Sequence, residues 1–275
     1  MQVRAVLYHP ELITDELYHA TLTRVDPDAQ AKIKGFYRRE DACRTLIGAI
    51  LLRLVLKERG IPHNSITVSK TPEGKPYLLN QGPDDPIAFN ITHDNSLISM
   101  AFGPGVHQAP AFSIGVDVMK VQIPAHDTTD SFIAVFEQQL TTLEKSQLAS
   151  DIPEQQRVER FFWMWTVKEA YTKALGLGMG FEFIRVEFDA VQRQIKIDGK
   201  TPKGWKFTLF TIPDADDLYE GVAAEFVGGD GSQVHDEVAK DCSSWLTVVD
   251  ALSVLQRAVD ELPSISSLVY KSGGV

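Results

Sequence analysis

A pattern of helices followed by several short strands occurs twice along this chain, and this order limits the possible folds more than any other feature. The first helical pattern covers residues 28–59, with an interruption near Gly35, and the second covers residues 131–149 and 154–175. Short apolar or alternating runs bounded by Gly, Pro and Asp follow both patterns, as is typical of strands. Helices and strands in separate runs predict an α+β fold. We therefore expect two similar halves, each with helices packed on a small antiparallel sheet.

The two expected halves meet at a polar stretch, KVQIPAHDTTDS, at residues 120–131. We predict an N-terminal half at residues 1–120 and a C-terminal half at residues 121–228. Residues 229–275 are expected to form a flexible loop (within GGDGSQVHDE), an amphipathic terminal helix (SSWLTVVDALSVLQRAVDEL) and a disordered tail. The prediction of two halves depends on the order of the elements, since the sequence itself contains no repeat.

The net charge and the cysteine content exclude several classes of protein. Among 275 residues, 27 are Lys or Arg and 37 are Asp or Glu, which gives a net charge of −10. Such a chain has no basic excess for sequence-independent binding of nucleic acid. Cys43 and Cys242 lie far apart, which argues against a disulfide framework or a zinc cluster and for a reducing compartment. The apolar stretches are too short to span a bilayer. Asp15 and Glu16 lie where a signal peptide would need its apolar segment or cleavage site. These features predict a cytoplasmic enzyme or binding protein with no membrane partner.

Three segments carry residues that are suited to chemistry, and the first is FNITHDNS at residues 89–96. It is expected to place His93 and Asp94 in the turn between two apolar strands. The polar residues of this segment are also common turn formers. Local sequence alone therefore favours a plain turn over a functional one.

The second segment is GVDV at residues 115–118, where a carboxylate lies within an otherwise apolar strand. A buried Asp117 would need a cation, an ion pair or hydrogen bonds, because burying an unpaired charge is costly. An Asp117 at the end of the strand would simply face solvent. The sequence leaves both interpretations open.

The third segment is WTVKEAYTK at residues 165–173, within the strongest helical pattern of the chain. Glu169 and Lys173 are four residues apart and lie on one face of the helix, with Lys168 beside them. A surface ion pair of this order would contribute only a few tenths of a kcal/mol. The aromatic residues FFWMW before it and the Gly-rich turn after it instead favour a face that borders a cleft.

Taken together, the three segments contain the groups needed for phosphoryl transfer. Asp117 and Glu169 are able to share a divalent cation, and Mg²⁺ is expected because it prefers oxygen ligands and phosphate. Several further side chains would supply positive charge to a phosphorylated ligand on that ion: His93, Lys168, Lys173, Lys75 in the turn TPEGKP, and Arg44 on the first long helix. We find no Walker loop and no Ser-His-Asp triad in the sequence.

Five segments of the chain resemble the surfactin-type 4′-phosphopantetheinyl transferases, in the order and spacing of that family. They are FYRREDACRTLIGAILLR (36–53), EGKPYL (73–78), FNITHDNS (89–96), IGVDV (114–118) and WTVKEAYTKALGLGMGF (165–181). The run LGLGMGF followed by IRVEFD is similar to the broad-specificity eukaryotic branch. The resemblance covers most of residues 1–190.

The resemblance implies a pseudo-twofold monomer with the active site in the cleft between its halves, where coenzyme A binds. The family transfers phosphopantetheine from coenzyme A, its substrate, to a serine of a carrier domain. It leaves adenosine 3′,5′-bisphosphate and requires Mg²⁺ as a cofactor. The implied partners are apo carrier domains of fatty-acid synthase, polyketide synthase, peptide synthetase and aminoadipate reductase systems.

The resemblance also implies roles for individual residues. Asp117 and Glu169 match the metal ligands, and Glu169 is the candidate general base for the serine hydroxyl, directly or through a water. Lys173 matches the lysine that stabilises the phosphate as the leaving group departs. His93 matches the histidine that contacts the pyrophosphate or the 3′-phosphate, and it is the third expected catalytic residue. The residues that match coenzyme-contacting positions are His93, Arg44, Lys75, Lys168, Lys173 and Lys32. Lys168, like Trp165, is also interpreted as part of the scaffold.

One position departs from the pattern of the family. Many members carry an acidic residue two positions after the strand aspartate, where this chain has Met119. A thioether is too soft to replace a carboxylate beside Mg²⁺. In the eukaryotic branch the residue after the motif histidine can reach the metal, so Asp94 is expected to supply the missing oxygen. The alternative is that Asp94 only caps its own turn.

Two other classes of function fit the same residues. One is a coenzyme A-binding or carrier-binding module that has lost catalysis, and the other is a different Mg²⁺-dependent nucleotide phosphotransferase. The presence of Asp117, Glu169 and Lys173 together favours the active transferase, because a degenerate homologue should have lost at least one of them.

Overall fold

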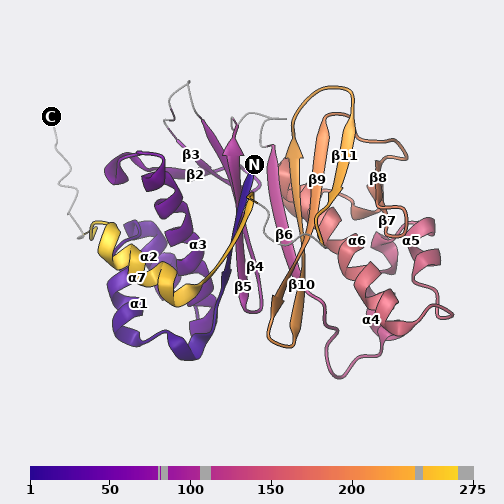
Figure 1. Ribbon diagram of the computed structural model, residues 1–275, viewed down its shortest axis with the longest axis horizontal. Coiled ribbons are helices and arrows are strands. Elements are labelled where there is room, and N and C mark those ends of the chain that lie inside the picture. Colours follow the sequence, from indigo (N-terminus) through magenta and orange to yellow (C-terminus); the bar gives the residue numbers. More distant parts are fainter. Residues whose placement is uncertain (80, 82–85, 106–112, 239–243, 266–275) are drawn as a thin grey trace. The chain divides into compact units, whose positions relative to one another are not determined.

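The computed structural model describes residues 1–79, 81, 86–105, 113–238 and 244–265 (Figure 1). The chain forms two compact units: unit 1 contains Met1–Val3 and Thr67–Thr247, and unit 2 contains Arg4–Ile66 and Val248–Val275. Helices combine with antiparallel sheets, which confirms the predicted α+β class with sheet-containing halves. The chain passes between the units within β1 (Gln2–Leu7) and β12 (Leu246–Asp250). The predicted halves, residues 1–120 and 121–228, divide the chain at other positions than these two units do. The predicted halves stay a prediction.

Unit 2 consists mainly of helices, and their starts follow local sequence signals. Thr14 accepts the N–H of Leu17 at the start of one helix, and Asp26 accepts the N–H of Ala29 at the start of the next. The expected interruption at Gly35 is confirmed, because this residue ends the second helix. The elements are η1 (Pro10–Leu12), α1 (Asp15–Leu22), α2 (Pro27–Lys34), α3 (Arg39–Glu58), η2 (His63–Ser65) and α7 (Ala251–Glu261).

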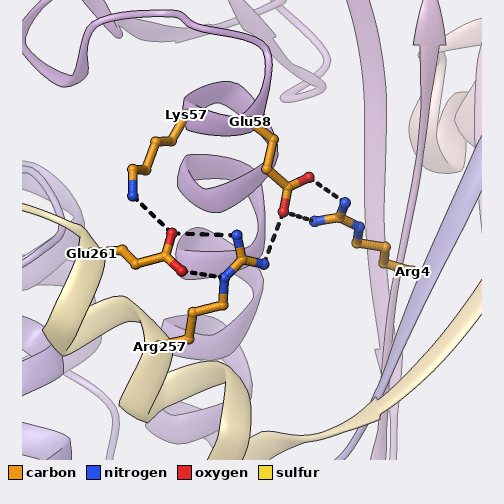
Figure 2. A network of polar contacts seen from close by, with 5 residues as sticks. All are labelled: Arg4, Lys57, Glu58, Arg257 and Glu261. Atoms are coloured by element: carbon orange, nitrogen blue, oxygen red, sulfur yellow. Dashed lines mark hydrogen bonds and ion pairs between the residues drawn. The ribbon is translucent and has the colours of Figure 1, made fainter.

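Charged side chains join α7 to α3, and α3 to β1 (Figure 2). Glu261 accepts a hydrogen bond from Lys57 at 2.7 Å and one from Nε of Arg257 at 2.8 Å. Arg257 also pairs with Glu58 at 2.8 Å, and Arg4 donates to the same carboxylate at 2.9 Å. The apolar face of α7 is buried through Ala251, Val254, Leu255 and Ala258. The terminal helix is therefore an integral part of unit 2.

Unit 1 contains a hairpin of β4 (Ile87–Asp94) and β5 (Leu97–Pro104). Its antiparallel register runs from Ile87 opposite Pro104 to Asp94 opposite Leu97. His93 and Asp94 were expected in the turn, but the pairing continues through both, and the turn falls on the next two residues. A smaller hairpin pairs β2 (Val68–Lys70) with β3 (Pro76–Leu78).

The second sheet of unit 1 has the strand order β11-β9-β10-β6. Its strands are β6 (Ile114–Lys120), β9 (Trp205–Asp214), β10 (Asp217–Phe226) and β11 (Ser232–Asp236). The long helix α6 (Glu154–Leu175) lies along one face of this sheet, against β6 and β10 (Figure 1). Its packing buries an apolar core that includes Phe162, Met164, Val167, Phe207, Leu209 and Val222. The remaining elements are α4 (Thr129–Val135), η3 (Glu137–Gln139), α5 (Thr142–Gln147), η4 (Gly178–Gly180), η5 (Phe183–Arg185), β7 (Val186–Asp189) and β8 (Gln194–Ile197).

The region after residue 228 differs from the expectation in two places. Residues 232–236 were expected in a flexible loop, but they form β11, which pairs in parallel with β9. Residues 246–250 were expected in the terminal helix, but they form β12, and Asp250 then caps α7 by accepting the N–H of Ser253 at 2.8 Å. Both strands pair with segments distant in sequence, which local periodicity does not report. The expected tail at 271–275 lies outside the described residues.

Within the part of the chain that the structure describes, no helix is both long enough and apolar enough to cross a bilayer.

Candidate active site

Polar side chains from three elements meet in unit 1. Lys173 of α6 donates to Oδ1 of Asp117 in β6 at 2.5 Å and to the hydroxyl oxygen of Thr92 in β4 at 3.0 Å. The hydroxyl of Thr92 in turn donates to the same Asp117 oxygen at 3.0 Å. The three groups form a closed triangle of hydrogen bonds between residues far apart in the sequence.

Gly115 allows α6 and β6 to come close enough for this triangle to form. A Cβ at Gly115 would lie 2.1 Å from the carbonyl oxygen of Ala170 and 2.3 Å from the backbone nitrogen of Ala174. No side chain fits there, so the helix packs directly on the backbone of the strand. Asp117 lies two residues further along β6 and therefore points to the same side, toward α6.

Glu169 of α6 lies close enough to the triangle to interact electrostatically with Lys173 and Asp117. It lies one helical turn before Lys173, so the two side chains share a face, and it is half-buried. Burial raises the pKa of Glu169, the Lys173 ammonium opposes this rise, and repulsion from Asp117 adds to it. Burial also raises the pKa of Asp117, which is 3% exposed, while Lys173 acts against that rise. Two carboxylates and one ammonium thus share a partly buried site, where charges interact more strongly than in water.

The carboxylates of this site fit a hard cation. Oδ2 of Asp117 is buried and has no hydrogen-bond partner among the described residues, and such a buried acceptor is costly when it stays unpaired. Mg²⁺ takes carboxylate, phosphate and water oxygens, so Asp117 and Glu169 are suitable ligands. In the described ranges no group of three or more His, Cys, Asp or Glu side chains is arranged to hold a metal ion. A substrate phosphate and water are able to supply further ligands.

Asp94 lies near this site, and one of its oxygens is already engaged. Oδ2 of Asp94 accepts the backbone N–H of Lys120 at 2.7 Å and the side-chain amide of Asn95 at 3.0 Å. The first of these bonds fastens the end of the β4–β5 hairpin to β6. The charge of Asp94 still reaches the site, because it contributes to the raised pKa of Asp117. Met119 packs against the apolar core around α6.

Lys168 was predicted as both a coenzyme contact and a scaffold residue, and its surroundings support the scaffold. It is completely buried, pairs with Glu144 at 2.9 Å and donates to the carbonyl oxygens of Phe183 and Val186. A buried ammonium with these partners has no exposed surface with which to contact a ligand. The structure therefore gives no support to Lys168 as a coenzyme contact.

The other predicted contacts differ in their exposure. Lys75 is 8% exposed, and its ammonium faces backbone carbonyl groups. His93 is exposed at the end of β4. Arg44 pairs with Asp41 at 2.7 Å on α3, and Lys32 is exposed on α2. Arg44 and Lys32 belong to unit 2, and their contact with coenzyme A stays a prediction.

Thr92 and Glu144 were not predicted from the sequence to make these contacts, although each carried a local signal. Thr92 follows Asn90 at the spacing of a strand, so both point to one side, and the amide oxygen of Asn90 accepts the N–H of Val116 at 2.9 Å. Glu144 belongs to a capping box in which its carboxylate accepts the N–H of Thr141 at 2.8 Å. The capping box was visible in the sequence, but the pairing of Glu144 with Lys168 was not.

Two family models match this chain. The model described as 4′-phosphopantetheinyl transferase superfamily matches residues 113–225, and the model described as 4′-phosphopantetheinyl transferase, N-terminal, matches residues 13–104. The first match contains Asp117, Glu169 and Lys173, and the second contains Thr92. The residues of the hydrogen-bonded triangle thus fall within the matched regions.

Several similar proteins align with most of this chain. A 4′-phosphopantetheinyl transferase pptA of Paxillus involutus is 44% identical, over 95% of this chain and 100% of its own length. An L-aminoadipate-semialdehyde dehydrogenase-phosphopantetheinyl transferase of Homo sapiens is 27% identical, over 87% of this chain and 80% of its own. A 4′-phosphopantetheinyl transferase of Bacillus subtilis is 29% identical, over 72% and 81% of the two chains.

Proposed function

We propose, since this chain belongs to the 4′-phosphopantetheinyl transferase superfamily and is an enzyme of that class, that it takes its phosphopantetheine from coenzyme A in a reaction that requires Mg²⁺. The acceptor is a serine hydroxyl of an apo acyl or peptidyl carrier domain, and the second product is adenosine 3′,5′-bisphosphate. The observation that carries this proposal is the triangle of Thr92, Asp117 and Lys173 with Glu169 beside it.

The residues of the site have distinct roles in the proposed reaction. The serine oxygen forms a bond to the phosphorus that carries pantetheine, and the bond from that phosphorus to the bisphosphate oxygen breaks. Glu169 takes the serine proton, directly or through a water, as a general base on the same face of α6 as Lys173. Lys173 donates to phosphate oxygens as negative charge moves to the leaving group. Its ammonium has three N–H groups, and Asp117 and Thr92 accept two of them.

Asp117 and Glu169 are the proposed holders of Mg²⁺, with Asp94 contributing an oxygen directly or through a water. The bound ion would neutralise charge on the pyrophosphate of coenzyme A. We assign contact with the phosphates of coenzyme A to His93 as well, and to Arg44 and Lys32.

Within the superfamily we assign this chain to the surfactin-type group and to its broad-specificity eukaryotic branch. Five motif segments in family order support the first assignment, and the human relative supports the second. The name of that relative makes carrier domains of aminoadipate reductases candidate partners, beside those of fatty-acid, polyketide and peptide synthetase systems. We further propose that the protein acts as a cytoplasmic monomer.

The test is incubation of the protein with coenzyme A, Mg²⁺ and an apo carrier domain, followed by measurement of the intact mass of the carrier. We expect the carrier to gain one phosphopantetheine group in the presence of Mg²⁺ or Mn²⁺ and none in excess EDTA. Glu169→Gln and Lys173→Met are expected to lower turnover by several orders of magnitude while folding is retained. Glu137→Gln, at an exposed carboxylate of unit 1, is the matched control and should retain full turnover.

The other outcomes separate the alternatives. Binding of coenzyme A without any mass gain on the carrier would indicate an inactive binding module. Transfer or hydrolysis with ATP in place of coenzyme A would indicate a different phosphotransferase. Full turnover in excess EDTA would remove the metal from the mechanism.

A further inference from the structure

The ammonium of Lys75 lies at the C-terminal end of α6. Its Nζ donates to the carbonyl oxygens of Lys173 at 2.7 Å and Ala174 at 2.9 Å, and to that of Ile114 in β6 at 2.9 Å. The three N–H groups of an ammonium thus meet three backbone acceptors. One side chain joins the last turn of the catalytic helix to the strand that carries Asp117.

The last carbonyl groups of a helix lack partners within the helix and carry the negative end of its dipole. A cation placed against them is therefore stabilising, and α6 ends directly afterwards at Gly176 in a left-handed conformation with φ of 73°. Lys75 supplies this cation from a part of the chain about a hundred residues away, since the separation from Ala174 is 99 residues. The interaction is tertiary and is not part of the helix's own capping.

The backbone around Lys75 is also held in place. The N–H of Lys75 is donated to the hydroxyl of Thr71 at 3.2 Å, and its carbonyl oxygen accepts the N–H of Thr71 at 2.9 Å. Gly74, with φ of 92°, allows the tight turn between them. The ammonium is therefore presented by a closed turn and not by a loose loop.

We propose that Lys75 is a positioning residue of the transferase, which fixes the last turn of α6 against β6 and so holds the Lys173 side chain beside Asp117. This inference rests on the proposed function for its catalytic consequence, but its structural part stands without it. It replaces the expected role of Lys75 as a coenzyme contact, because a side chain that is 8% exposed and bonded to three carbonyl oxygens is turned toward the protein.

The test compares Lys75→Met, which keeps the aliphatic stem and removes the donors, with Lys70→Met at an exposed position of β2. The first measurement is hydrogen exchange of the amides at 173–177 in the protein without ligand. The second is steady-state transfer to an apo carrier domain, with kcat and KM for coenzyme A determined separately.

A positioning role predicts faster exchange at 173–177 and a kcat lowered by about 10²-fold, as for a misplaced catalytic group, with little change in KM for coenzyme A. Lys70→Met should match the wild type in both measurements. A raised KM with unchanged exchange would restore the coenzyme contact and overturn the proposal. Faster exchange with an unchanged kcat would also overturn it, because the hydrogen bonds of Lys75 would then have no effect on the position of Lys173.

Lys75→Met could fold poorly, so a second variant, Lys75→Arg, is compared alone and in combination with Lys173→Met. The same comparison separates this inference from the proposed function. Lys75→Arg keeps a cation on the carbonyl groups, so it should recover part of the exchange protection. Lys75→Arg combined with Lys173→Met should be no slower than Lys173→Met alone, whereas an independent coenzyme contact would make the losses multiply. If the wild type transfers no phosphopantetheine, the proposed function fails. The exchange result then still tests whether Lys75 holds the last turn of α6 in place.

Discussion

Gly115 of β6 lies so close to Ala170 of α6 that a Cβ on the glycine would be 2.1 Å from the alanine's carbonyl oxygen. This approach sets the distance between the strand that carries Asp117 and the helix that carries Glu169 and Lys173. The glycine before the strand aspartate is therefore a packing requirement of the site. It needs no special backbone angle, only the absence of a side chain.

Replacing Gly115 with Ala should destabilise unit 1 by about 1–3 kcal/mol or more, because the atoms that the new Cβ would meet belong to the backbone of α6 and cannot move away alone. The free energy of unfolding in a denaturant titration measures this. Gly231→Ala is the control, since a Cβ there meets nothing within 4 Å, and it should change stability by less than about 0.5 kcal/mol. Equal stability of the two variants would show that α6 and β6 separate without cost.

Lys168→Met should destabilise the protein by about 3–5 kcal/mol, because it leaves the carboxylate of Glu144 buried without its cation. Both side chains are 0% exposed. Adding Glu144→Gln removes the stranded charge and should recover part of the loss. Denaturant titrations of the single and double variants measure this. A raised KM for coenzyme A with normal stability in Lys168→Met would instead support a coenzyme contact.

Asp94→Asn separates the structural bond of this residue from its proposed role at the metal. The amide oxygen of Asn still accepts the N–H of Lys120, so the hairpin should stay fastened, but the negative charge is lost. We expect Mn²⁺ binding, followed by electron paramagnetic resonance, to weaken by about 10-fold or more. Met119→Glu in the same chain should restore part of it. Unchanged Mn²⁺ binding in Asp94→Asn would leave Asp94 as a structural residue only.

His63 should make unit 2 sensitive to acid. Burial lowers its pKa to about 4, and the charge of Arg53 adds to this. The unfolded chain, with an ordinary pKa near 6.5, binds the proton more readily between pH 6.5 and 4, so stability falls as pH decreases through that range. His63→Gln should reduce this loss, whereas His126→Gln, with a side chain that is 86% exposed, should not. Identical pH profiles for His63→Gln and the wild type would contradict the prediction.

Removing the terminal helix should open unit 2. A chain that ends at Asp250 lacks the apolar face of α7 and also Arg257 and Glu261 of the charged network (Figure 2). Cys43, 2% exposed on α3, reports the opening once Cys242→Ser removes the second thiol. We expect a thiol reagent to modify Cys43 much faster in the shortened chain than in full-length Cys242→Ser. Equal rates would show that unit 2 folds without α7.

Several features of this protein followed from local sequence. The periodic segment at 154–175 forms a helix with those bounds, and Gly35 separates α2 from α3 as expected. These elements were predictable because periodicity, capping residues and helix-ending glycines act between residues only a few positions apart. The strands β11 and β12 were not, because a short strand is stabilised mainly by a partner elsewhere in the chain.

The sequence by itself determined the α+β class and the presence of Asp117, Glu169 and Lys173, together with the family that these residues indicate. Only the tertiary structure decided that Thr92 joins Asp117 to Lys173, that Lys75 is turned toward the end of α6, and that Lys168 is buried with Glu144. The physical reason is that a side chain's partner and burial depend on which segments pack together. Lys173 is 56 positions from Asp117 and 81 positions from Thr92 in the sequence, yet the three form one hydrogen-bonded triangle. No local pattern encodes a contact between residues so far apart.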